Sequence, residues 1–191
     1  MDVKPLLQFL LTGSFKLLTE VLEGTTDEEW KVRPFSGANL VGFTIWHCAR
    51  TIDWAVNRVL RGSPELADLA EWRDLNVAGA VFGAGASREA ADRVALEVPR
   101  TRVLGYVNAL REDALSWLAT VPPEELSAAT DLKASHAKKA EYMAAPVWAE
   151  LEDLDGIPKW QFLARPCASH IRVHYGEVRS QLEAVRAAAS S

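Results

Sequence analysis

The segment from Leu40 to Leu60 constrains the fold most strongly, because it is apolar on nearly every side of a helix. Its large apolar residues recur at helical spacing with little polar surface between them: Val41, Phe43, Ile45, Trp46, Ile52, Trp54, Val56 and Val59. A helix that is apolar all round is a buried helix. Gly62-Ser63-Pro64 ends the pattern. We therefore expect a long helix in the interior of the protein.

Three further stretches show the apolar stripe of an amphipathic helix. They cover residues 3–23, residues 99–120 and a final segment that runs to about residue 187. Pro166 lies inside this last segment, so the helix is either kinked there or begins there. No alternating strand pattern competes with these helices. The sequence predicts a single all-α domain over residues 1–191, a four-helix bundle with extra short helices in its long connections.

Two long connections are less regular. Residues 63–87 include an uncharged run rich in glycine and alanine at 75–86, which is either a flap over a site or a simple crossover loop. Residues 124–157 are polar and mixed, with a short helix expected around residues 138–152. His136 lies in this second connection, and we expect it to be an exposed loop histidine.

The composition excludes several classes of protein. A chain of 191 residues with 49% hydrophobic and 25% charged residues is typical of a globular domain, and its net charge of −5 argues against nucleic-acid binding. Two cysteines make no disulfide framework, so we expect a cytoplasmic protein. The apolar run near the N-terminus resembles neither a signal peptide nor a membrane span, so no membrane partner is expected.

The histidines carry the clearest chemical signal. The chain has four, and His170 and His174 are spaced i, i+4, which places both imidazoles on one face of a helix. His47 lies in the middle of the buried 40–60 segment. Three buried imidazoles would each need a partner, and a shared metal ion satisfies all of them. We therefore predict that His47, His170 and His174 form one metal site.

Other metal sites do not fit this pattern. A di-iron bundle needs a glutamate three residues before a histidine. The residues three before the four histidines are Thr44, Lys133, Cys167 and Ile171. A His-Glu-x-x-His protease motif fails because Ile171 follows His170, and no Cys-x-x-Cys-His haem motif is present.

Three neutral histidine ligands leave the charge of a divalent ion uncompensated. This arrangement suits Zn²⁺ or Ni²⁺ and favours an anionic fourth ligand, such as hydroxide or an external thiolate. An open fourth position is typical of a catalytic site. Cys167 or Cys48 could instead fill that position and close the site.

Further residues are candidates for the surroundings of the metal. Asp53 and Glu177 could accept hydrogen bonds from the imidazoles, as carboxylates often do around metal ligands. Arg50 could meet an anionic substrate at the mouth of the site. Trp46 and Trp54 could line the pocket.

Two segments resemble the signature segments of the DinB/YfiT-like superfamily of metalloenzymes, namely Leu40-Val-Gly-Phe-Thr-Ile-Trp-His-Cys-Ala-Arg50 and His170-Ile-Arg-Val-His-Tyr-Gly-Glu177. Residues 26–34 also look like its first inter-helix segment, whereas residues 124–157 match poorly. The resemblance implies a four-helix bundle of DinB/YfiT-like connectivity, commonly a homodimer. It also implies a divalent metal held at the positions of His47, His170 and His174.

The resemblance also suggests a reaction. Characterised relatives include transferases and isomerases that use small thiols such as mycothiol or bacillithiol. We therefore expect a metal-dependent S-transferase or isomerase acting on a small molecule, with Arg50 and Arg172 as candidates to bind carboxylates of the thiol. The alternatives are a metal-dependent hydrolase that activates water by the same site and a non-catalytic, metal-stabilised binding or dimerisation module.

Overall fold

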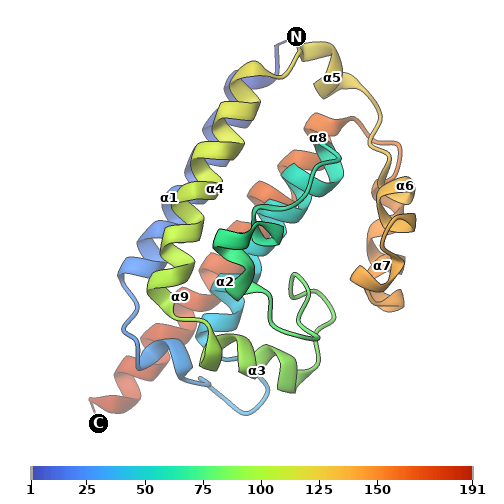
Figure 1. The fold of residues 1–191 in the computed structure, drawn as a ribbon. Helices are drawn as coiled ribbons and strands as arrows, with labels where there is room; N and C mark the ends of the chain where they lie inside the picture. The colour runs from blue at the N-terminus through green and yellow to red at the C-terminus, as the bar shows by residue number, and fades with distance from the viewer. Residues whose placement is uncertain (1, 191) are drawn as a thin grey trace.

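The computed structural model describes residues 2–190, and 73% of the chain is helical (Figure 1). The four long helices are α1 Lys4–Glu23, α2 Val41–Asp53, α4 Arg100–Thr120 and α9 His170–Ala189. The shorter α-helices are α3 Arg88–Glu97, α5 Pro123–Ser127, α6 Leu132–Ala137, α7 Ala145–Leu151 and α8 Lys159–Ala164. Between residues 2 and 190 no β-strand forms, apart from one isolated bridge between Ala129 and Pro158. The all-α prediction is confirmed.

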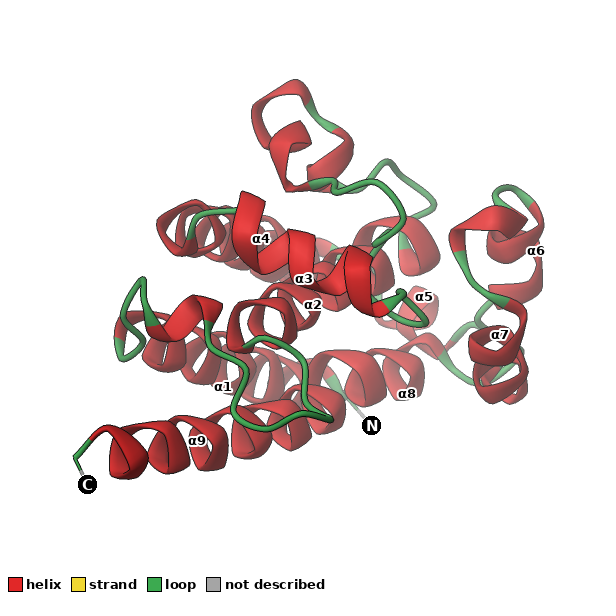
Figure 2. Ribbon diagram, turned by 90° about the horizontal axis from the view of Figure 1, so that it is seen from below, coloured by secondary structure: helices red, strands yellow, loops and turns green. Residues whose placement is uncertain are grey.

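The four long helices pack against one another. Helix α1 lies along α4, and both α1 and α2 pack against α9, as the two views show (Figures 1 and 2). Helix α2 also contacts α4 and α1. Helices α6 and α7 stand on the opposite side of the molecule from α1 and α4 (Figure 1). The bundle therefore carries an additional helical layer beside one of its flanks.

Helix α2 is enclosed on all sides, as its composition predicts. Every residue from Val41 to Asp53 is buried. The helical path then continues as a π-helix over Trp54–Leu60, so the predicted helix at 40–60 is real but widens in its last two turns. Such wide turns often occur near functional sites.

A second π-helix, Arg165–Ser169, joins α8 to α9 and contains Pro166. The proline therefore lies within a continuous helical path, and α9 begins at His170. Proline lacks the N–H that an α-helical turn would use, and a wider turn accommodates this loss. Of the two outcomes expected for Pro166, a distorted helix is the one observed.

The connection after α2 is better packed than a flexible loop would be. It contains the short 3-10 helices Leu66–Asp68 and Ala70–Leu75, followed by turns. In the uncharged run, Val77, Ala80 and Phe82 are buried against the core. The segment is thus neither a bare crossover nor an unpacked flap, because its apolar side chains belong to the core.

The second long connection contains more helix than expected. Helix α6 begins earlier than the predicted 138–152 helix, and the 3-10 helices Ala140–Tyr142 and Glu152–Leu154 flank α7. Pro146 lies in the first turn of α7, where its missing N–H is tolerated. His136 is not an exposed loop residue: it lies on α6, half-buried, with its ring stacked on Trp148 at 4.1 Å.

Among the helices described over residues 2–190, none combines the length and apolar character that crossing a bilayer requires.

The close contact between α2 and Trp30 gives a test of the packing. A Cβ added at Gly42 would lie 2.6 Å from Cδ2 of Trp30, which is buried and donates from its indole nitrogen to the Val98 carbonyl at 3.1 Å. Gly42→Ala should therefore lower the free energy of unfolding by about 1–3 kcal/mol through overpacking. Denaturant titration measures this change.

Gly13→Ala is the matched control in the interior of α1. The nearest atom to its new Cβ, on Arg172, is 3.6 Å away, so this variant should gain about 0.5–1 kcal/mol from helix propensity alone. Equal stability of the two variants would contradict the packing of α2 on Trp30.

Candidate metal centre

Three histidines from distant parts of the chain meet at the contact between α2 and α9. The ring centroids of His47 and His170 are 5.1 Å apart, those of His47 and His174 are 5.4 Å apart, and those of His170 and His174 are 4.5 Å apart. One ring nitrogen from each residue lies within 4.8 Å of the other two. Two helices that the sequence separates by more than a hundred residues thus bring the three imidazoles together.

Backbone geometry explains this convergence. His47 lies in the middle of α2, whose every face is covered, so its side chain can only point into the interior. His170 is the first residue of α9 and His174 follows one turn later. Side chains at i and i+4 stack on one face of a helix. The packing of α2 on α9 then places His47 opposite that face.

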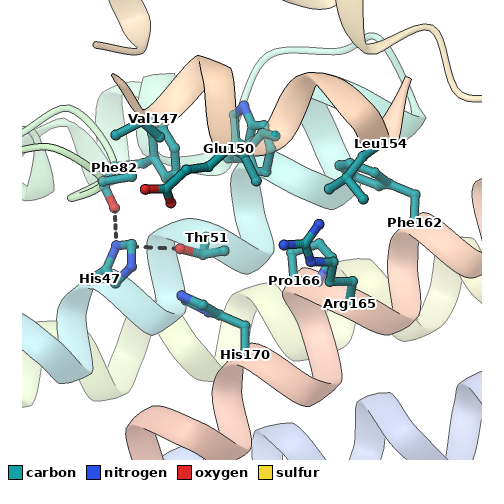
Figure 3. Close-up of a pocket in the computed structure, with 13 residues that line it drawn as sticks. His47, Thr51, Phe82, Val147, Glu150, Leu154, Phe162, Arg165, Pro166 and His170 are labelled. Atoms are coloured by element: carbon teal, nitrogen blue, oxygen red, sulfur yellow. Dashed lines mark hydrogen bonds between the residues drawn. The ribbon is translucent and has the colours of Figure 1, made fainter. Parts of the chain in front are cut away.

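The ring of His47 is held by a backbone carbonyl. Its Nδ1 lies 2.7 Å from the oxygen of Phe82 and 3.4 Å from Oγ1 of Thr51 (Figure 3). A carbonyl oxygen only accepts hydrogen bonds, so Nδ1 carries the proton and donates it. The lone pair of the ring is therefore on Nε2, which leaves Nε2 available as a ligand atom.

The backbone around Phe82 is unusual on both sides. Val81 has φ of 52° and Gly83 has φ of 106°. Positive φ is rare for a β-branched residue and costs on the order of 1–3 kcal/mol. Gly83 also has no room for a side chain, because a Cβ would lie 2.8 Å from Cγ of His47. These two residues turn the Phe82 carbonyl toward the imidazole.

A carboxylate holds the second ring. Nδ1 of His174 lies 2.8 Å from Oε2 of Glu177, one turn further along α9, and its Nε2 lies 3.1 Å from Nε2 of His170. Glu177 is also fixed by Gln181, whose amide donates to Oε1 at 3.0 Å. The carboxylate favours a proton on Nδ1 of His174, which again leaves Nε2 facing the other histidines.

Burial keeps two of the imidazoles neutral. It lowers the pKa of His47 to about 4, against an opposing effect of the Phe82 carbonyl. It lowers the pKa of His170 to about 3, with further lowering by the neighbouring His47 and His174 and by the positive charge of Arg165. Neutral imidazole is the form that binds metal ions, so these two rings are ready to act as ligands at neutral pH.

The arrangement fits a tetrahedral metal ion. Metal–nitrogen bonds of 2.0–2.1 Å place two ligand nitrogens about 3.3–3.4 Å apart. The observed nitrogen separations, from 3.1 Å between His170 and His174 up to the 4.8 Å limit of the cluster, bracket that value. Nδ1 of His170 is buried and has no hydrogen-bond partner among the described residues. A cation shared by the Nε2 atoms would relieve the crowding of the three imidazole rings.

A cavity of about 210 Å³ opens beside His47 and His170 (Figure 3). Most of its walls are apolar and come from three parts of the chain: Trp54 and Phe82, Phe162 and Pro166, and the residues Val147, Leu151 and Leu154 in and after α7. Glu150 and Arg165 add one carboxylate and one guanidinium. The site therefore combines candidate metal ligands with space for a small molecule.

Several cavity residues were not among the sequence candidates. Phe82 acts through its backbone, which no residue type reveals. Val147, Glu150, Leu151 and Leu154 follow i, i+3, i+4, i+7 spacing, and this stripe in the polar 124–157 connection was the available signal for a cavity wall. Arg165 precedes His170 by five residues on the same helical path, but its sequence context carries no such signal.

Arg50 and Asp53 are placed differently from expectation. Arg50 is buried, with 1% of its side chain exposed, and pairs with Glu65 at 3.1 Å and Asp53 at 3.6 Å, so it does not lie at the mouth of the site. Asp53 accepts hydrogen bonds from the backbone N–H groups of Leu66 and Ala67 and from the hydroxyl of Tyr106, and from no imidazole. Both expectations are wrong because buried partners hold the two side chains inside the bundle, Glu65 and Asp53 for Arg50, and the backbone N–H groups and Tyr106 for Asp53.

The two tryptophans proposed to line the pocket, Trp46 and Trp54, lie in different places. Trp46 is fully buried and donates from its indole nitrogen to the Leu75 carbonyl at 3.1 Å, so it belongs to the core. Trp54 lines the cavity and stacks on Phe82 with the ring centroids 5.0 Å apart.

The two cysteines lie outside the histidine cluster. Cys48 and Cys167 are buried and free, and burial raises the pKa of both thiols. Over the described part of the chain, the group of side chains close enough to share an ion consists of the three histidines alone. Neither cysteine therefore closes the fourth position in this arrangement.

A family model of the DinB superfamily matches residues 10–178, which include all three histidines and every residue that lines the cavity. The chain belongs to the DinB superfamily. A search of curated proteins found no match. The resemblance seen in the sequence is thus confirmed, and the match also covers residues 124–157, which the two signature segments left unassigned. In this DinB protein, these residues supply the far wall of the cavity.

The contact between Gly83 and His47 gives a sharp test. Gly83→Ala should displace the His47 ring from the Phe82 carbonyl and weaken metal binding by about 10–100-fold, the cost of losing an outer partner of a ligand. Competition with a chromophoric chelator measures the affinity.

Gly156→Ala is the control for this variant. Gly156 also has a positive φ, of 80°, but nothing lies within 4 Å of its added Cβ. It should lose about 1 kcal/mol of stability from backbone strain and keep its metal affinity. Unchanged affinity in Gly83→Ala would argue against His47 as a ligand.

Proposed function

We propose that this chain is a metal-dependent enzyme that activates a small thiol for S-transfer or isomerisation. The observation that carries the proposal is the convergence of three imidazoles beside a largely apolar cavity. In this proposal His47, His170 and His174 hold a divalent ion, with Zn²⁺ or Ni²⁺ suited to a set of nitrogen ligands. A fourth position facing the cavity stays open for the thiol.

The charge balance supports an anionic fourth ligand. Burial keeps His47 and His170 neutral, so these ligands do not offset the charge of a divalent ion. A bound divalent ion would deprotonate a thiol and present the thiolate as a nucleophile. The cysteines of the chain do not compete for this role, because burial raises the pKa of both Cys48 and Cys167 and neither joins the cluster.

The residues of the chain have defined tasks in this reaction. The Phe82 carbonyl and Glu177 keep protons on the Nδ1 atoms of His47 and His174, so both rings present Nε2 inward. The apolar walls exclude water that would compete with the thiol. Glu150, which lines the cavity, could accept the proton that the thiol releases.

Glu150 also supports a second candidate function. A carboxylate beside an open metal position is the arrangement that a metal-dependent hydrolase uses to take a proton from water. We rank this reaction second because most of the cavity wall is apolar.

We also propose that the protein is a cytoplasmic homodimer. Phe9 on α1 and Val173 on α9 leave 71% and 69% of their surface exposed, and α1 packs against α9. Two such side chains on adjacent helices would be covered by a second copy. A monomeric mass of the purified protein by light scattering would contradict this proposal.

Metal content and thiol chemistry test the function together. Purified protein should contain about one divalent ion per chain, and His47→Ala and His174→Ala should lose it together with any activity. His136→Ala is the control, since this fourth histidine stacks on Trp148 away from the cluster. Elemental analysis measures the ion.

The reaction is followed with one of three thiols, mycothiol, bacillithiol or glutathione, and with monochlorobimane as the electrophile. The thiolate sulfur forms a bond to the carbon that carries chlorine, and chloride leaves with the electron pair of the broken bond. Metal-dependent turnover with one of these thiols is expected. Turnover of esters or amides instead would favour the hydrolase. Loss of metal and stability in His47→Ala, without any reaction in either screen, would favour a metal-stabilised binding module.

A further inference from the structure

Two charged side chains that line the cavity, both of them exposed to solvent, lack an ion-pair partner within residues 2–190. Arg165 and Glu150 both line the cavity, and neither makes an ion pair or a side-chain hydrogen bond within residues 2–190. Other arginines near α2 are paired: Arg58 binds Glu65 at 2.5 Å and Arg61 binds Asp113 at 2.7 Å. The guanidinium of Arg165 is thus exposed at the edge of the cavity and open to a ligand that enters from solvent.

The position of Arg165 relative to the histidines is defined by one helical path. Arg165 begins the π-helix that ends where His170 begins α9, and Pro166 beside it is buried in the cavity wall. Figure 3 shows the Arg165 guanidinium and the Glu150 carboxylate on different sides of the cavity, with Glu150 toward His47. A ligand in this space would meet a cation on the His170 side and a carboxylate on the His47 side.

The space between these groups suits a compact apolar body. Trp54, Leu151, Leu154 and Phe162 line it. A dry apolar cavity of about 150 Å³ in another protein holds benzene. The 210 Å³ here would therefore hold a ring or a branched aliphatic group with a short chain.

We propose that the cavity binds a small apolar carboxylate, with its carboxylate paired to Arg165 and its other end directed at the three-histidine centre. This ligand class rests on the proposed function, since it describes the molecule that meets the activated thiol or is itself that thiol. Guanidinium matches a carboxylate with two parallel hydrogen bonds, which ammonium does not provide.

Glu150 gives the ligand a direction. A carboxylate placed at the His47 end would lie near the Glu150 carboxylate, and like charges repel, here over a short distance because Glu150 is exposed and solvent screens its charge. The same group at the other end meets the unpaired Arg165. Glu150 therefore acts as a positioning residue that opposes the reversed orientation of the ligand.

The test compares two probes that share a phenylpropyl body and differ in the polar group at its end, a charged carboxylate against a neutral hydroxyl. Zinc-loaded protein is titrated by calorimetry with 3-phenylpropanoate and with 3-phenylpropan-1-ol. The wild type should bind the carboxylate about tenfold more tightly, the expected effect of one charge-assisted hydrogen-bonded pair. Arg165→Met should remove this preference while leaving the affinity for the alcohol unchanged.

Three further variants sharpen the result. Arg165→Lys keeps the charge without the planar fork and should retain part of the preference. Arg73→Met, an exposed arginine outside the cavity, should bind both probes as the wild type does. Glu150→Gln should bind the carboxylate at least as tightly as the wild type, since a repulsive charge is removed.

The outcomes separate this proposal from the thiol reaction. An equal affinity of the wild type for both probes would overturn the ligand class. A carboxylate preference that persists in Arg165→Met would also overturn it, because the carboxylate would then be bound to zinc. Weaker carboxylate binding in Glu150→Gln would overturn the proposed direction. Thiol turnover without the Arg165 preference refutes only the ligand class, and the preference without thiol turnover refutes only the thiol reaction.

Discussion

The hydrogen bond from His47 to the Phe82 carbonyl is the contact on which the candidate centre depends. A neutral histidine inside a bundle needs a partner for its N–H, and here a backbone oxygen at 2.7 Å supplies it. That single bond sets the tautomer of the ring and points Nε2 at α9. It also requires a costly backbone conformation at Val81 and Gly83, which the surrounding packing must maintain.

A network of buried charges and stacked rings supports this conformation. Arg50 donates to the Val81 carbonyl at 3.4 Å and pairs with Glu65, which in turn accepts from the hydroxyl of Tyr142 at 2.6 Å. The ring of Tyr142 stacks on Phe82 with centroids 5.6 Å apart. Arg50 thus acts on the centre through the segment that orients His47, although it never reaches the cavity. Removing one partner of a buried pair of this kind leaves an uncompensated buried charge, which is strongly destabilising.

The sequence predicts features that follow from helical periodicity. It does not predict contacts that form only when the long connections fold onto the helices. The apolar pattern of residues 40–60 and the i, i+4 spacing of His170 and His174 follow from helix geometry, so the helices and the histidine cluster were predictable. Asp53 was assigned to an imidazole because it lies on the helix of His47. It instead binds the backbone after Glu65, a partner that only the fold of the 63–87 connection brings near. The Phe82 carbonyl belongs to the same class, since a backbone group has no sequence signature.

The candidate metal ligands and the cavity walls come from different parts of the chain, and this separation affects which small molecules the site can bind. The long helices α2 and α9 supply the candidate metal ligands, whereas the two connections supply Phe82, Val147 and Glu150, the groups that a bound molecule would touch. Both connections are joined through the stack of Phe82 on Tyr142, so the cover over the centre behaves as one packed unit. A substitution on the cavity face of α7 should therefore change which molecule fits without moving a histidine. A substitution at Val81 or Gly83 should move His47 and affect every ligand alike.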